Sequence, residues 1–396
     1  MTRRIGVEER RARLVLRHHL AGQTRVDRPA EAAAGVVVLH ATDPASVYLQ
    51  ALARMRVPAR STVEHALYDE RSLVRMLGMR RTMFVAPVEF ASVVQAAATR
   101  AIAVRERRRL VQRITAAVEL LGVPDVDAWL TDVQEATLRA LLVRGEATAA
   151  ELSTDEPRLR TQVLMAEGKK YEAMTNITTW VLNLLSMEGR IVRGRPRGSW
   201  ISSQYRWAPL QSWLPDGLAE RPVVDAQAEL IRQWLARFGP GTLADLKWWT
   251  GFTLGEVRKA VARLDTVEVD LDGTPGLVLA DDVEPVAAPG TPDAVLLPAL
   301  DPTPMGWQQR DWYLGSYGKL LFDRSGNVGP TIWWDGRIVG GWGLPPSGGV
   351  AYRLLEDIGT DGVAAVEKAA AQVADWIGPV RFVPRFRTPL ERELAS

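Results

Sequence analysis

The turn after a short valine run constrains the fold of this chain more than any other stretch. Residues 35–55 read GVVVLHATDPASVYLQALARM, and Thr42 or Asp43 can cap a helix whose first turn begins with a proline. The upstream segment AEAAAGVVVLH, residues 30–40, predicts another helix that ends at His40. Two helices joined by about three residues form a helix-turn-helix. We therefore expect the His40 and Thr42 side chains to lie in this turn and to face a common cleft.

The composition excludes several classes of protein. With 396 residues, of which 47% are hydrophobic, the chain can form several domains with ample cores. It has no cysteine, which excludes disulfides, cysteine-ligated zinc and a thiol nucleophile. The four histidines lack metal-ligand spacing, so we expect neither a metal nor another cofactor. The charged N-terminus does not look like a signal peptide, and no apolar run approaches the ~20 residues of a membrane helix, which favours the cytoplasm.

The charge is unevenly distributed along the chain. Residues 1–200 contain 31 Lys or Arg and 22 Asp or Glu, whereas residues 201–396 contain 18 and 25. The basic half, which includes RERRR at 105–109 and RIVRGRPRG at 190–198, is the candidate for binding an anionic polymer. Two other interpretations stay open. The 43 arginines against 6 lysines can reflect genomic base composition, and RERRR can be the solvated face of a helix.

The first part of the chain predicts a winged helix. Residues 7–21 have the pattern of an amphipathic helix, and the two helices around the turn follow it. The segment SLVRMLGMRRTMFVAP, residues 72–87, then alternates apolar and polar residues around a glycine turn, which predicts a β-hairpin. Three helices and a hairpin form a winged helix, whose wing would bring Arg75, Arg80 and Arg81 to DNA phosphates.

The pattern of helices followed by a hairpin occurs twice more, so the sequence predicts tandem winged helices. Residues 176–209 contain a helix and a hairpin whose tip carries Arg193, Arg195 and Arg197 as further DNA contacts, and residues 222–283 hold the third copy. We expect four units, with the bounds 1–87 (winged helix 1), 88–215 (helical connector and winged helix 2), 216–285 (winged helix 3) and 286–396 (C-terminal β domain with one helix).

The C-terminal region is predicted to be mostly β. Strand-like segments separated by Gly and Pro surround one helix, TDGVAAVEKAAAQVADWIG. The segment LLPALDPTPMGWQQRDWYL, residues 296–314, sets polar residues in an apolar context. Two interpretations stay open. Asp301 can cap a turn while Arg310 pairs with a nearby acid, or both residues can face the same cleft as His40.

Four separated motifs together resemble the AlkZ-type winged-helix DNA glycosylases: LHATDPASVYLQALARM, SLVRMLGMRRTMFVAP, LLPALDPTPMGWQQRDWYL and GPTIWWDGRIVGGW. The resemblance implies an α+β fold of about three tandem winged helix-turn-helix units around a DNA-sized groove, closed by a small, mostly β, barrel-like C-terminal domain. It also implies hydrolysis of the N-glycosidic bond of bulky alkylated purines without a metal. The substrates would be N7 or N3 adducts, including interstrand crosslinks made by genotoxic natural products. The expected partner is damaged double-stranded DNA, bound by a nucleoid-associated monomer.

The sequence departs from the family pattern at the turn itself. Characterised members carry Gln-x-Gln or Gln-x-Asp, and alignment on the following Asp-Pro puts His40 and Thr42 in those positions. A neutral imidazole with a pKa near 6.5 can accept a proton from water, and Thr42 can orient either partner. Excision would then fall below about pH 6. Asp43 is the candidate carboxylate, although its position favours capping. In the other interpretation, Thr42 and Asp43 only cap the helix, and His40 bonds a carbonyl.

No lysine lies beside the turn, so we expect an abasic site as the product, without cleavage of the strand. A rival function is a non-catalytic winged-helix DNA-binding protein, either a regulator or a binder of genotoxin adducts, and replacement of both glutamines suits it. Three tandem units, without an evident sensor domain or dimerising coiled coil, favour the glycosylase.

Overall fold

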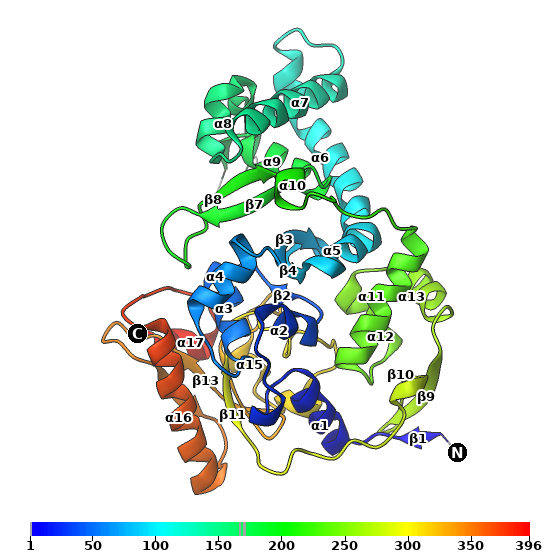
Figure 1. The fold of residues 1–396 in the computed structure, drawn as a ribbon, viewed down its shortest axis with the longest axis vertical. Coiled ribbons are helices and arrows are strands. Elements are labelled where there is room, and N and C mark those ends of the chain that lie inside the picture. Colours follow the sequence, from blue (N-terminus) through cyan, green and yellow to red (C-terminus); the bar gives the residue numbers. More distant parts are fainter. Residues whose placement is uncertain (1, 166–167, 169–171) are drawn as a thin grey trace.

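The computed structural model describes residues 2–165, 168 and 172–396, and it shows a mixed α+β fold with five small sheets in this part of the chain. Figure 1 shows an upper lobe formed by the middle of the chain, whereas the N-terminal and C-terminal parts pack together below it. The described residues contain no helix long and apolar enough to cross a membrane.

The first unit is built on a three-stranded sheet in the order β2-β4-β3, with antiparallel pairing throughout. Proline at the first position and the Asp43 side chain, which accepts a hydrogen bond from the Ala45 N–H, start the helix after the turn. Its elements are α2 (Pro29–Gly35), β2 (Leu39–His40), α3 (Pro44–Leu52), α4 (Arg60–Tyr68), β3 (Leu73–Gly78) and β4 (Thr82–Pro87).

The structure corrects the prediction for this unit in three respects. The helix before the turn ends at Gly35 instead of His40, because Val37 has a left-handed φ of 66°, through which a right-handed helix cannot continue, and His40 lies on a strand opposite Phe84. The third helix of the unit is α4, which was not predicted. The predicted first helix, α1 (Val7–Arg17), contacts α11 of the third unit instead.

The second unit forms the upper lobe in Figure 1 and has its own hydrophobic core. Apart from the four-residue α10, its helices were predicted, as was its last hairpin, whereas a hairpin inserted between α8 and α9 was not. The connection consists of α5 (Val88–Val94), a π-helical turn (Gln95–Thr99) and α6 (Arg100–Glu119). The unit contains α7 (Val126–Arg144), α8 (Ala149–Asp155), β5 (Gln162–Met165), β6 (Ala173–Asn176), α9 (Thr178–Met187), β7 (Ile191–Pro196), β8 (Tyr205–Pro209) and α10 (Leu210–Trp213).

The third unit follows the predicted order of three helices and a hairpin. Reciprocal hydrogen bonds between Thr242 and Asp245, and between Thr253 and Glu256, form capping boxes that start its second and third helices. Its elements are α11 (Val223–Phe238), α12 (Leu243–Thr250), α13 (Leu254–Val261), β9 (Thr266–Leu271) and β10 (Thr274–Leu279), and β1 (Arg3–Arg4) pairs in parallel with β9.

The C-terminal unit is an open antiparallel sheet, so the expected barrel is wrong for the described residues. The sheet order β11-β12-β13-β14 leaves β11 and β14 as unpaired edges, and α16 and α17 pack against β11 and β13. The expected strand WYLG is instead a short helix. The elements are β11 (Ala294–Leu297), α14 (Asp311–Leu314), α15 (Gly318–Leu321), β12 (Thr331–Trp334), β13 (Arg337–Gly343), β14 (Ala351–Leu354), α16 (Gly359–Ile377) and α17 (Pro389–Leu394).

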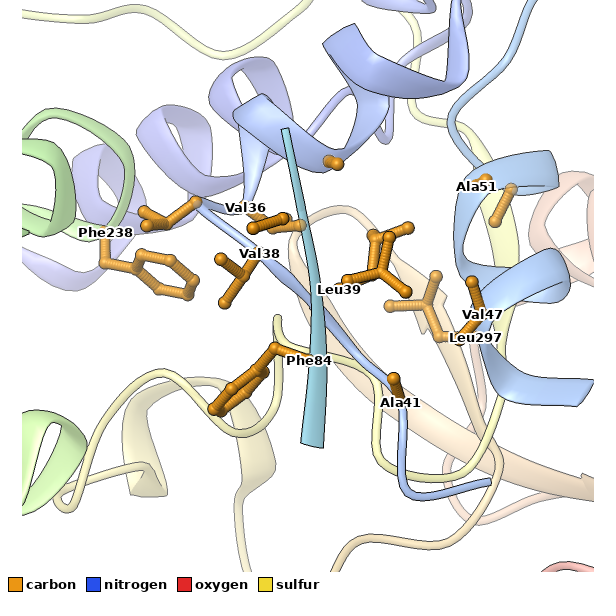
Figure 2. Close-up of a cluster of buried hydrophobic side chains, with 14 of the residues drawn as sticks. Val36, Val38, Leu39, Ala41, Val47, Ala51, Phe84, Phe238 and Leu297 are labelled. Atoms are coloured by element: carbon orange, nitrogen blue, oxygen red, sulfur yellow. The ribbon is translucent and has the colours of Figure 1, made fainter. Parts of the chain in front are cut away.

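One hydrophobic core joins the first unit, the third unit and the C-terminal sheet. Figure 2 shows Leu39 of β2 close to Leu297 of the C-terminal sheet, and Val38 on the side of Phe238 from α11. Leu39 is fully buried, and Val38 is 1% exposed. The strand that carries His40 therefore lies where three units meet, and its backbone is fixed by apolar packing on both sides.

A buried ion pair crosses the same junction. The Arg54 guanidinium donates to both carboxylate oxygens of Asp301 at 2.8 and 2.9 Å, and both side chains are fully buried. Arg54 also donates to the Gln50 carbonyl and to Thr303 Oγ1, which lies 2.9 Å from Nδ1 of the buried His18. The network thereby connects α1, α3 and the loop after β11.

Arg54→Ala should lower the free energy of unfolding by about 3–5 kcal/mol, because it leaves the Asp301 carboxylate buried without its counter-charge. Chemical denaturation measures this loss. Arg56→Ala is the matched control, since Arg56 pairs with Asp27 on the surface and should cost about 0–1 kcal/mol. Equal losses in the two variants would show that the buried pair does not stabilise the junction.

Candidate active site

Side chains from neighbouring elements hold the backbone of the turn. The Gln50 side chain, fully buried on α3, accepts a hydrogen bond from the His40 N–H at 2.9 Å and donates to the His40 carbonyl at 3.0 Å. Arg75 Nη1 donates to the Ala41 carbonyl at 3.0 Å. The short edge strand β2 therefore gains on its free side the hydrogen bonds that a further strand would supply.

The His40 imidazole is uncharged at neutral pH. Its side chain is 9% exposed and meets the Phe84 ring edge to face at 5.7 Å. Burial, and then the positive charge of Arg80, lower the pKa of His40 to about 3. The Thr42 backbone N–H donates to Nδ1 at 3.4 Å, which places the imidazole proton on Nε2. The expected pKa near 6.5 is corrected, and titration of His40 gives no reason for excision to fall below pH 6.

Asp43 is engaged through both carboxylate oxygens. One accepts from the Ala45 N–H at 3.2 Å, as a helix cap, and the other from the Arg385 N–H at 3.3 Å. Burial raises the pKa of Asp43 above its usual value. Thr42 is only partly buried between these two anchored neighbours. The arrangement fixes Asp43 as a helix cap and leaves Thr42 as the more exposed side chain of the turn.

Arg75 is not on the wing surface, which corrects its predicted contact with phosphate. It is 3% exposed and lies over the Tyr205 ring at 4.7 Å, so it connects β3 with the hairpin of the second unit. Arg193 lies over Trp207 at 5.1 Å and donates to the Asn183 side chain. Burial and the charge of Arg75 lower the pKa of Arg193 to about 10, which leaves it positively charged.

The remaining predicted arginines of this hairpin differ in their surroundings. Arg195 is exposed but pairs with Asp69 at 2.9 Å on α4. Arg197 is exposed, and the described residues offer its side chain no ion pair. Arg193 and Arg197 line a cavity of about 350 Å³, together with Thr148, Ala149, Ala150, Thr179, Leu182, Ser203, Gln204, Tyr205 and Trp207. Its basic and aromatic lining suits nucleic acid.

A second basic cavity lies between the first wing, α6 and the third unit. Its volume is about 330 Å³, and Arg80, Arg81, Arg105 and Arg109 contribute to its wall. Arg81 pairs with Glu106 at 3.0 Å. The RERRR segment is therefore only partly a solvated helix face, because two of its arginines line this cavity.

The two candidate residues of the C-terminal unit do not share a cleft. Asp301 is fully buried in its ion pair and accepts from the Thr303 N–H as a turn cap, which agrees with the first interpretation of that residue. Arg310 lies over the rings of Trp248 and Phe322, at 5.1 and 4.6 Å. Of these two residues, only Arg310 lies near Arg80, which in turn lies near His40.

Sequence reasoning missed Gln50, Trp248 and Arg385. Gln50 had a signal, since it is the polar residue within the apolar helical run VYLQAL. Trp248 and Arg385 are distant in sequence from the turn, and no local pattern marks them. The described residues contain no group of three or more His, Asp or Glu placed to hold a metal ion.

Comparison with known proteins identifies the class. A model of the AlkZ-like DNA glycosylase family matches residues 33–376, and the chain belongs to this family. The predicted enzyme class, a DNA glycosylase that acts in DNA repair, is thereby confirmed, and with it DNA as the partner. Among solved structures, the chain is similar to Streptomyces sahachiroi DNA glycosylase AlkZ, with a TM-score of 0.72 and 20% identity over 96% of this chain and 100% of that chain. No curated protein sequence matches the chain significantly.

His40 should make the protein less stable as the pH falls. In the unfolded chain the imidazole gains a proton below its ordinary pKa of 6.5, whereas the folded chain resists protonation down to about 3. Unfolding therefore takes up a proton between these values, and stability should fall by about 2 kcal/mol from pH 7 to pH 5 on account of His40. Chemical denaturation at the two pH values measures the loss.

His40→Gln should lose less stability than the parent over this pH range. His65→Gln is the matched control, because His65 is exposed on α4. If His40→Gln and the parent lose the same free energy, the His40 imidazole does not remain neutral in the folded chain.

Proposed function

We propose that the chain excises bulky alkylated purines, as N7 or N3 adducts, from double-stranded DNA and leaves an abasic site without cutting the strand. The observation that supports this most directly is the anchored turn. By the resemblance, alignment on Asp-Pro puts His40 and Thr42 where the family pattern has Gln-x-Gln or Gln-x-Asp. Gln50 and Arg75 hold the backbone of this turn. No lysine stands at the turn, which favours hydrolysis over Schiff-base chemistry.

The proposed reaction needs little acid or base catalysis. Alkylation at N7 makes the purine a cation, so the glycosidic electron pair can leave with the base without a proton, and a sugar cation develops. The His40 Nε2–H donates to the attacking water, and that water donates to Thr42 Oγ1. The water oxygen then bonds to C1′ and releases its proton to solvent. His40 and Thr42 act by orienting water, because an imidazole with a pKa of about 3 is a weak base.

The proposed architecture consists of three winged helices and a C-terminal unit, with the bounds 1–87, 88–215, 216–285 and 286–396. The order of helices followed by an antiparallel hairpin supports the first three. The proposed phosphate contacts are the exposed arginines of the hairpins β3–β4 and β7–β8, together with the half-buried Arg193. The exposed ones are Arg80, Arg81, Arg195 and Arg197. In this proposal the protein binds DNA as a monomer.

His40→Ala and Thr42→Ala should each slow excision by roughly tenfold, the value of one hydrogen bond to a neutral water. The assay uses duplexes with N7-methylguanine or with a bulky N7 or N3 adduct, followed by alkaline cleavage. Thermal unfolding is the control for the variants, since loss of capping alone would lower stability by about 1 kcal/mol and leave the rate per folded molecule unchanged.

The rival function, a DNA-binding protein without catalysis, gives a different result. The variant with His40→Gln and Thr42→Gln restores the family pattern on the same backbone. If this variant excises the adducts and the parent does not, the parent is an adduct binder. Excision by the parent that disappears in His40→Ala at equal stability supports the proposed enzyme.

A further inference from the structure

Two arginines from distant parts of the chain meet on one tryptophan. The Cζ atom of Arg80, at the tip between β3 and β4, lies 4.3 Å from the ring centroid of Trp248 on α12. The Cζ atom of Arg310, just before α14, lies 5.1 Å from the same centroid and 4.6 Å from that of Phe322. The cluster thereby combines the first unit, the third unit and the C-terminal unit, and the sequence predicted neither its tryptophan nor its assembly.

The positive charges of this cluster are not compensated. Within the described ranges, neither guanidinium makes an ion pair or a side-chain hydrogen bond, whereas Arg81 next to Arg80 pairs with Glu106. Burial, and then the charge of Arg310, lower the pKa of Arg80, which shows that the two cations repel each other. An anion that bridges them would remove this repulsion and fill their unused donors.

The geometry of the cluster is fixed before any ligand arrives. Stacking on an indole holds a guanidinium plane and leaves its edge free to donate. Arg80 has a φ of 53°, in the left-handed region, and a side chain on Gly251 would collide with it, since an added Cβ would lie 2.9 Å from Arg80 Cγ. Backbone strain of this kind is retained where the surrounding structure enforces it, and it concentrates at binding sites.

The cluster lies beside the turn. His40 pairs with Phe84 on β4 and the Ala41 N–H donates to the Met83 carbonyl at 2.8 Å, so the turn runs toward the hairpin tip that carries Arg80. Arg80 also lines the basic cavity that continues along α6. A positive charge that develops near His40 during excision would be opposed by Arg80 unless an anion neutralised it. DNA carries such an anion at every nucleotide.

We infer that Arg80 and Arg310, stacked on Trp248, bind one DNA phosphodiester next to the damaged nucleotide. The inference rests on the proposed function for the position of the lesion beside His40. The bound phosphate carries one negative charge and lowers the net charge of the two guanidiniums from +2 to +1, so the electrostatic opposition to a sugar cation is weaker when DNA is in place. Arg310 thereby acquires a role that its sequence context did not define.

The first test measures binding of an undamaged duplex over a series of salt concentrations by fluorescence anisotropy. Each phosphate contact adds about 0.9 to the slope of log affinity against log salt. Because the two side chains share one phosphate, the Arg80→Gln, Arg310→Gln double variant should flatten the slope by roughly that amount, and each single variant should flatten it by less. Arg353→Gln is the matched control, since Arg353 pairs with Glu393 on the surface of the C-terminal unit and should leave the slope unchanged.

The second test changes the DNA instead of the protein. A single uncharged methylphosphonate linkage is moved along a duplex that contains N7-methylguanine. The parent should lose affinity when the neutral linkage is next to the lesion, and the Arg80→Gln, Arg310→Gln double variant should not lose more at that linkage than elsewhere. An unchanged salt slope in the double variant, or an equal loss at every linkage in the parent, overturns the inference. Both tests measure binding alone. A chain that passes them but does not excise therefore refutes the proposed function and keeps the phosphate site.

Discussion

The buried pair of Arg54 and Asp301 is the interaction on which the arrangement of the units depends. Removing two charges from water is costly, and the pair persists because the guanidinium and the carboxylate satisfy each other in a bidentate geometry, with Thr303 and a backbone carbonyl filling further sites. That carbonyl belongs to Gln50, whose side chain holds His40. The junction between the units and the backbone of the active site therefore share one hydrogen-bond network.

The electrostatics of the turn follow from the burial of His40. Burial keeps the His40 imidazole neutral, and the charge of the Arg80 guanidinium lowers its pKa further. In the proposed reaction the alkylated base is already cationic, so it leaves without a proton from the protein. What the reaction requires is negative charge close to the sugar, and the DNA backbone can supply it.

The parts of the fold that local chemistry determines were predictable. Helices with strong start signals, such as those capped by Asp43, Thr242 and Thr253, lie where the sequence placed them. Strand β2 was not predictable, because its two residues are extended only through pairing with β4 and through the amide of Gln50. The open C-terminal sheet was missed for the same reason, since closure or opening is a property of edges that are distant in sequence.

The same limit applies to the site. The turn could be proposed because its residues are adjacent in sequence, and Arg80, Arg81 and Arg197 could be proposed because a hairpin tip is exposed. Burial of Arg75 under Tyr205 depends on contact between two units. Gln50 and Arg75 hold the backbone at residues 40–42 through hydrogen bonds. Its path therefore does not depend on the side chains at positions 40 and 42. Other side chains can therefore replace these two while the backbone of the turn keeps its path, and new chemistry can arise there without a new fold.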